Sequence, residues 1–345
     1  MIVVKAFGPN IVTTYMIEMN NKTIMLDFNC SDILVSDINK IDYIFISHEH
    51  LDHFESLMDY KIVKHLKPSV RIFSTKTTKE LIQYISKEKM DRAGYNRDAK
   101  EFITKLIDSI EPIFLNNKNV LEDNIYFYLY RSGHTFGSCA VHLIGEYSIL
   151  YTGDIDYVNN NPLRQHQIPY GLQIDYLIID GTRLFEMEYK GVSVNRFIEN
   201  VKKFKNKKCL EYNVRPEKAV FYAFSLAEKM DDYIFVYGEQ MRWYLKIIAE
   251  NGYNPYVNNR IVFTDSVSDY YPDQKVIKFV FSDIKYDLNS RLSLHISKFD
   301  LLDIINNHII NNVKVLVGHY EKNNTDSIES FTDCVLLIKG VNIIE

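Results

Sequence analysis

The chain has 345 residues, 46% hydrophobic and 13% aromatic, which suits a globular protein with a large core. Its apolar runs are too short to span a bilayer, and its four scattered cysteines form no CxxC pair, which excludes a zinc finger and argues against a disulfide framework. The formal net charge of −5 is unlike that of a typical nucleic-acid binder, although a metal-lined groove can supply positive charge locally. We read no signal peptide and expect a cytoplasmic protein, or a nuclear one in a eukaryote.

The N-terminal part is rich in β-forming residues separated by turn signals such as GPN at 8–10. Two segments, 54–67 and 75–94, have helical spacing, and the second opens on threonines that can cap it. Several strands end on a residue that can bind a metal or carry a proton, which is how a site is built across the end of a sheet. The predicted strands are 1–7, 13–19, 23–28, 43–48, 70–75, 125–134, 139–145, 147–154 and 176–182.

The middle of the chain alternates helices with strands, which predicts a small α/β unit inserted into the main domain. A basic run at 202–208 could hold a phosphate backbone there, but a solvated helix face is the favoured interpretation. We predict a first part of the main domain at 1–182, an inserted cap at 183–285 and the C-terminal part of the main domain at 286–345. The later elements predicted are helices at 193–208, 215–230, 239–252 and 298–309, and strands at 233–238, 260–266, 275–282, 291–297, 313–319 and 334–340.

The stretch SHEHLDHF, residues 47–54, gathers three histidines and two acids directly after a predicted strand. Crowded ionisable groups cost stability unless a partner neutralises them, and a metal ion would do so. Alternate residues of a tight turn would aim His48 and His50 at one ion, and Asp52 and His53 at a neighbouring one. Imidazole and carboxylate ligands favour zinc, with manganese or iron as alternatives.

Two later strand ends add groups of the same kind. His134 follows a predicted strand in RSGHTFGS, and Asp154 follows another in YTGDID. A carboxylate between two cations can bridge them, and two metals roughly 3.5–4 Å apart form a hydrolytic centre that activates a water. We therefore predict two divalent metal ions.

These motifs, in this order, resemble those of the metallo-β-lactamase fold hydrolases, and Asp27 in TIMLDF matches that family's early aspartate, which supports the first loop without binding metal. The resemblance implies an αββα sandwich of the α/β class. The segments YLIIDGTR, LSLHISKFDLLDII and VKVLVGHYE are similar to three further motifs of the β-CASP nuclease branch, and the insert lies where that branch carries its cap domain. The length of the insert is closer to that of the DNA-crosslink-repair nucleases than to that of RNase J.

Carried over position by position, the resemblance assigns metal ligands and proton donors. His295 would protonate the leaving oxygen and Asp180 would orient it, while a water between the ions attacks phosphorus. Two departures leave the roles of His295 and His319 interchangeable: Ile-Ser follows His295, and the third motif reads Gly-His-Tyr-Glu instead of His-Gly-Glu. The first ion would be held by His48, His50, His134 and Asp154, and the second by Asp52, His53, Asp154 and His319, with Asp52 also counted as catalytic.

These residues predict a metal-dependent nuclease that hydrolyses phosphodiester bonds of single-stranded DNA or RNA. The alternative is a two-metal hydrolase of a small ester, lactone or thioester, because one fold serves many substrates and the acidic net charge favours this interpretation. A non-catalytic scaffold is disfavoured because every metal motif is intact. His319 favours RNA processing and the compact insert favours DNA repair, so the sequence leaves the choice between RNA and DNA open. It also leaves open whether cutting is exonucleolytic or endonucleolytic and which proteins are partners.

Overall fold

The computed structural model divides into two compact units, which are described separately. Unit 1 comprises Met1–Asn159, Arg164–Met187 and His295–Glu345, and unit 2 comprises Asn160–Leu163 and Glu188–Leu294. The predicted cap domain at 183–285 falls largely in unit 2, and its assignment as a β-CASP cap remains a prediction. The structure describes residues 2–8, 11–156, 166–182, 199, 201–203, 209–227, 233–255, 261–263, 275–280, 298–309, 312–320 and 334–344.

The first sheet of unit 1 has seven strands in the order β18-β1-β2-β3-β4-β5-β6. β18, β1, β2 and β3 pair antiparallel, whereas β3 to β6 run parallel, so β3, β4 and β5 end at one edge. The strands are β1 (Ile2–Phe7), β2 (Thr14–Met19), β3 (Lys22–Leu26), β4 (Ile41–Phe45), β5 (Arg71–Ser74), β6 (Glu111–Pro112) and β18 (Gly340–Ile344).

The second sheet also has seven strands, in the order β17-β16-β11-β10-β9-β8-β7. β7 to β10 form an antiparallel meander, and β10, β11, β16 and β17 run parallel, so these four also end at a common edge. The strands are β7 (Asn119–Glu122), β8 (Ile125–Arg131), β9 (Cys139–Ile144), β10 (Ser148–Tyr151), β11 (Tyr176–Asp180), β16 (Lys314–Gly318) and β17 (Cys334–Leu336).

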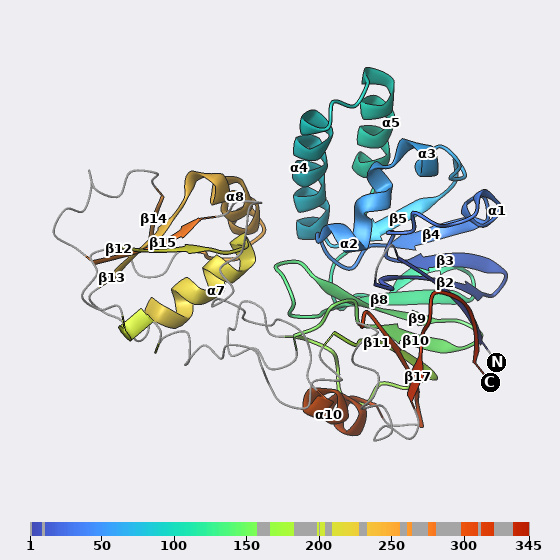
Figure 1. Cartoon of the computed structure of the whole chain (residues 1–345). Helices are drawn as coiled ribbons and strands as arrows, with labels where there is room; N and C mark the ends of the chain where they lie inside the picture. Colours follow the sequence, from blue (N-terminus) through green and yellow to red (C-terminus); the bar gives the residue numbers. More distant parts are fainter. Residues whose placement is uncertain are drawn as a thin grey trace. The chain divides into compact units, whose positions relative to one another are not determined.

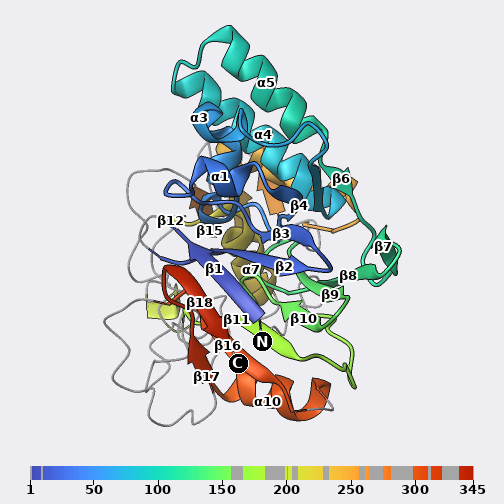
Figure 2. The same cartoon turned by 90° about the vertical axis from the view of Figure 1, so that its right-hand side faces the viewer.

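Three apolar layers hold unit 1 together. Phe45 of the first sheet and Phe127 of the second meet in the core between the sheets. Ile82 of α4 belongs to the core that covers the outer face of the first sheet, and Ile304 of α10 to the core that covers the second. Figures 1 and 2 show the resulting order of helices, sheet, sheet and helix, which confirms the predicted αββα sandwich. The helices are α1 (Val35–Ile38), α2 (Leu51–Phe54), η1 (Glu55–Met58), α3 (Tyr60–Val63), α4 (Lys76–Arg92), α5 (Arg97–Asp108) and α10 (Lys298–His308).

The single helix predicted at 54–67 is wrong, because this stretch forms the short elements α2, η1 and α3. The backbone of Phe28 explains the break: its N–H donates to the His53 carbonyl (2.7 Å) and its carbonyl accepts from the Ser56 N–H (3.2 Å). Asp59 then leaves the helical conformation, with ψ at 100°, and its side chain caps α3. The loop is therefore tied to the end of β3, which keeps its ionisable residues at the edge of the sheet. The long helix predicted at 75–94 is observed as α4, whereas α5 and β18 were not predicted.

Unit 2 is a four-stranded parallel sheet, β12-β15-β13-β14, and the predicted alternation of helix and strand is present in it. Its strand β12 was not predicted, and the helix predicted at 193–208 lies mostly outside the described residues. No helix among the described residues is long and apolar enough to cross a membrane. The elements are β12 (Cys209–Asn213), α7 (Pro216–Ala227), β13 (Tyr233–Tyr237), η2 (Glu239–Met241), α8 (Arg242–Glu250), β14 (Ile261–Phe263) and β15 (Lys275–Val280).

Candidate metal centre

The strand ends of the two sheets bring the predicted ligands of the first ion together. His48 and His50 follow β4, His134 lies in the turn between β8 and β9, and Asp154 follows β10. Each offers one ligand atom, and these four atoms lie within 4.8 Å of one another. His48 and His134 are fully or almost fully buried, so this group is shielded from solvent.

A second group and a third lie beside the first. Asp52, His53 and His319 bring ligand atoms within 4.8 Å of one another, and so do Asp154, Asp180 and His319. His319 follows β16 and contacts both groups: its Nδ1 lies 2.5 Å from Asp154 Oδ1, and its Nε2 lies 3.7 Å from Asp52 Oδ2. The structure therefore places all seven predicted metal ligands at one edge of unit 1.

The two oxygens of Asp154 face different histidines. Its Oδ2 lies 3.7 Å from His48 Nε2 and 3.4 Å from His134 Nε2. Its Oδ1 lies 3.4 Å from His53 Nε2 and 2.5 Å from His319 Nδ1. A carboxylate in this position can serve one cation with each oxygen, which is the arrangement predicted for a bridging ligand.

The tautomers of two histidines favour cation binding. His53 Nδ1 lies 2.6 Å from Asp27 Oδ2, a carboxylate that can only accept, so Nδ1 carries the proton. The Ser47 hydroxyl donates to Asp27, and it therefore accepts from His48 Nδ1 at 2.9 Å. The opposite nitrogens, Nε2 of His48 and Nε2 of His53, are buried and have no hydrogen-bond partner among the described residues. Once deprotonated, these two buried nitrogens would each offer a lone pair to a metal ion beside Asp154, and buried polar atoms without a partner are otherwise costly.

Without a metal, the histidines of the centre differ in how readily they bind a proton. Burial, together with neighbouring imidazoles, holds the pKa of His48 well below its usual value. Burial also disfavours charge on His53, but nearby carboxylates, Asp154 and Asp27 foremost, outweigh it and hold its pKa well above the usual value. The same balance, with Asp154 as the main carboxylate, raises the pKa of His319 to about 9. Metal binding would therefore displace protons from this side of the centre.

Asp180 and His295 were the predicted proton-handling pair. Asp180 ends β11, is buried, and accepts a hydrogen bond from the Thr182 N–H at 2.9 Å. Its Oδ1 lies 3.9 Å from His319 Nδ1, so it borders the centre. His295 lies outside the described residues, and its role as the acid stays a prediction.

Some supporting residues were not identified from the sequence. The Thr135 hydroxyl donates to Glu49 Oε2 at 2.7 Å, which ties the His134 turn to the first motif. The hydroxyls of Thr75 and Thr78, at the start of α4, both donate to the Gly137 carbonyl in the same turn. Glu49 lies within the quoted first motif, but its spacing gave no sign of a partner 86 residues away.

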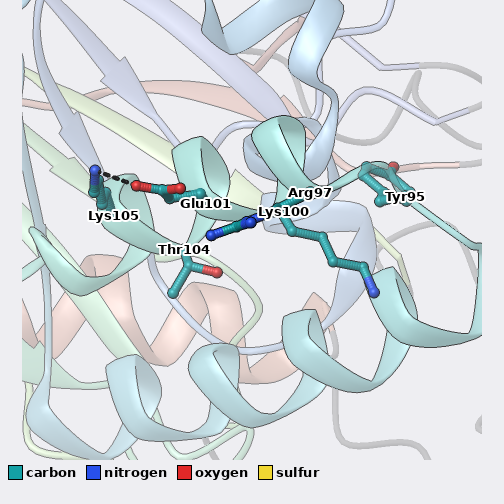
Figure 3. Close-up of a pocket in the computed structure, with 6 residues that line it drawn as sticks. All are labelled: Tyr95, Arg97, Lys100, Glu101, Thr104 and Lys105. Carbon is teal, nitrogen blue, oxygen red and sulfur yellow. Dashed lines mark hydrogen bonds and ion pairs between the residues drawn. The ribbon is translucent and has the colours of Figure 1, made fainter.

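A hollow of about 620 Å³ lies elsewhere on unit 1, at the start of α5 (Figure 3). Lys105 pairs with Glu101 there at 2.7 Å, and Lys100 pairs with Asp91 at 2.8 Å. Most of its charge is therefore already compensated on the helix surface. None of the candidate metal ligands lines it; the lining residues are Tyr95, Arg97, Lys100, Glu101, Thr104 and Lys105.

About half of the chain, including the first group of candidate ligands, matches a known fold family. Residues 14–176 match the profile of the metallo-beta-lactamase superfamily domain. The chain carries a metallo-β-lactamase domain. The matched segment includes His48, His50, His134 and Asp154, so the domain supplies the whole first group of candidate ligands.

The metallo-β-lactamase domain is similar to that of several proteins named as ribonucleases. Endoribonuclease YSH1 of Candida albicans is 29% identical over 193 residues, which cover 49% of this chain and 22% of the relative. Probable RNase MJ4 of Methanocaldococcus jannaschii is 32% identical over 183 residues, covering 49% of this chain and 41% of the relative. Cleavage and polyadenylation specificity factor subunit 3 of Dictyostelium discoideum is 29% identical over 157 residues, covering 44% of this chain and 20% of the relative. Each match therefore spans less than half of the relative's own length.

A solved structure shares the fold over the whole chain. The crystal structure of a protein of unknown function from Enterococcus faecalis V583 aligns with a TM-score of 0.53 and 12% identity, and the alignment covers 99% of each chain. At this identity the likeness concerns the fold alone. It agrees with the αββα architecture of the metallo-β-lactamase domain.

Proposed function

We propose that this chain is a metal-dependent nuclease that hydrolyses phosphodiester bonds, with single-stranded RNA as its substrate. The observation that carries the proposal is the position of Asp154, whose two oxygens face two separate sets of imidazoles. Two divalent cations held there would polarise a water and neutralise charge on a phosphate. The ribonuclease names of the relatives favour RNA over DNA.

The ligand sets follow from the three groups of side chains. His48, His50 and His134 would hold one cation and Asp52, His53 and His319 the other, with Asp154 shared. Imidazole with carboxylate suits zinc best, and manganese or iron would also be accepted by such a site.

The chain's own residues divide the remaining work. His319 faces Asp154 with one ring nitrogen and Asp52 with the other, which supports a ligand role for His319 and leaves proton donation to His295. Asp180 is buried beside His319 and already accepts a backbone hydrogen bond, so it is fixed in place to orient a proton donor.

A cleavage assay tests the proposal. Zinc-loaded and manganese-loaded protein is given 5′-phosphorylated RNA and single-stranded DNA of matched sequence. We expect RNA cleavage that Asp52→Ala abolishes and that Asp123→Ala leaves unchanged, because Asp123 is an exposed acid in the turn between β7 and β8, away from the centre. The fragment lengths then distinguish internal from terminal cutting.

The outcomes separate the competing functions. Cleavage of DNA alone would refute the choice of RNA. No cleavage of either polymer, by protein shown to hold two ions, would refute the nuclease and favour a hydrolase of a small ester, lactone or thioester.

A further inference from the structure

A buried tyrosine contacts the support behind the metal ligands. Tyr151 ends β10, three residues before Asp154, and is 3% exposed. Its hydroxyl donates to Asp27 Oδ2 at 2.5 Å and also lies 3.4 Å from the Thr13 carbonyl. Burial, followed by the charge of Asp27, raises the pKa of Tyr151 well above its usual value, so the phenol keeps its proton and remains a donor.

Asp27 is the point at which several contacts converge. Its Oδ1 accepts from the Ser47 N–H at 2.6 Å. Its Oδ2 accepts from the Ser47 hydroxyl at 2.7 Å, from His53 Nδ1 at 2.6 Å and from Tyr151. Asp27 also has a φ of 60°, an uncommon conformation for a non-glycine residue that the surrounding contacts must maintain. The plane of this carboxylate therefore sets the directions of the groups that donate to it.

Two histidines depend on that plane. His53 donates to Asp27 directly, and His48 does so through the hydroxyl of Ser47. The ring nitrogens opposite these contacts are the buried Nε2 atoms that face Asp154. A rotation of the Asp27 carboxylate would turn both rings together and spread the atoms that must meet a cation.

We infer that Tyr151 is a positioning residue for the metal centre: its hydroxyl fixes the Asp27 carboxylate and thereby aims Nε2 of His53 and of His48. The inference rests on the proposed metal site. Partners bonded directly to metal ligands typically change metal affinity by about 10- to 100-fold when removed, and Tyr151 acts on two such ligands at once through Asp27.

Core packing is the competing explanation. Tyr151 packs edge-on against Tyr15, with ring centroids 5.6 Å apart, in the core between the sheets. Packing needs only the ring, whereas positioning needs the hydroxyl, so Tyr151→Phe separates the two. Tyr43 offers a matched control, because it is buried in the same core and its hydroxyl donates at 2.7 Å to the carboxylate of Glu122 on β7, which contacts no candidate ligand in the described structure.

The experiment measures zinc affinity of the full chain by competition with a chromophoric chelator at fixed pH. We expect Tyr151→Phe to bind zinc at least tenfold more weakly than the unmodified protein and Tyr43→Phe to bind within twofold of it. Melting temperatures with and without zinc give a second measure: the increase that zinc produces should shrink in Tyr151→Phe alone, while the metal-free value reports any loss of packing.

Each other outcome decides against the inference. Unchanged zinc affinity in Tyr151→Phe, or an equal loss in Tyr43→Phe, would refute the positioning role and leave the proposed function standing. An unmodified protein that binds no zinc, manganese or iron would refute both.

Discussion

Gly318, within the third motif, makes room for Tyr15. A Cβ at Gly318 would lie 1.6 Å from the Tyr15 hydroxyl oxygen and 2.5 Å from its Cζ. Tyr15 has little space to move, since it is 1% exposed, packs on Tyr151 and donates to the Val12 carbonyl at 3.1 Å. The same carbonyl accepts from the His319 N–H at 2.9 Å, so a displaced phenol would also disturb the backbone of His319.

Gly318→Ala should therefore destabilise unit 1 strongly. Overpacking a core costs about 1–3 kcal/mol, and breaking a buried hydrogen bond adds about 1–3 kcal/mol, so we expect a loss of roughly 2–6 kcal/mol in the free energy of unfolding. Urea unfolding of metal-free protein measures it. Gly94→Ala is the control, because a Cβ there meets nothing within 4 Å and its φ of 65° costs only about 1–2 kcal/mol.

A second substitution isolates the cause. Adding Tyr15→Phe to Gly318→Ala removes the atom at 1.6 Å, so the double variant should lose less than the two single losses combined. A loss below about 1 kcal/mol for Gly318→Ala, or strictly additive losses, would refute this account of the glycine.

Four further predictions concern metal, proton release, stability at low pH and the cap of α4. A chelator should lower the melting temperature, because the two proposed cations would neutralise the crowded centre; an unchanged curve with no metal found by elemental analysis would contradict this. Zinc uptake at pH 7 to 8 should release protons, since the pKa of His319 is about 9 without metal, and zinc affinity should rise with pH up to that value. Calorimetry in two buffers of different ionisation enthalpy counts the released protons, and the His319→Gln variant should release fewer of them. Burial lowers the pKa of His142 to about 4, so the unfolded chain binds this proton first as pH falls below about 6.5, and His142 by itself should make the protein about 2 kcal/mol less stable at pH 5 than at pH 7. Urea unfolding at both pH values should show the loss between pH 7 and pH 5 to be smaller in His142→Gln than in the unmodified protein by about this amount. Thr75→Ala should cost about 1–2 kcal/mol in the same assay, because it removes the cap of α4 and one of two hydrogen bonds to Gly137; a loss as small as that of an exposed threonine would argue against this role.

The candidate ligands could be predicted from the sequence because they lie in short local motifs. His48, His50, Asp52 and His53 lie within six residues, so one turn after one strand must gather them. Asp154 and His319 each follow a run of strand-forming residues, and parallel strands end at a common edge. The αββα layers were implied by the resemblance of these motifs to those of the metallo-β-lactamase fold hydrolases. The helix at 54–67 was mispredicted because its periodicity was correct locally, while hydrogen bonds to Phe28 overrode it.

Only the tertiary structure decided which groups support the ligands and how they are oriented. Tyr151 meets Asp27 across 124 residues, and His319 meets Asp154 across 165. A local pattern carries no information about such pairs: the first depends on how the two sheets pack, and the second on which strands neighbour one another in the second sheet and where they stop. The same holds for Gly318, whose absent side chain is explained only by the hydroxyl of Tyr15 from the other sheet. The chain thus encodes its candidate metal ligands in local motifs, whereas the hydrogen bond from Tyr151 to Asp27 forms only once the two sheets have come together.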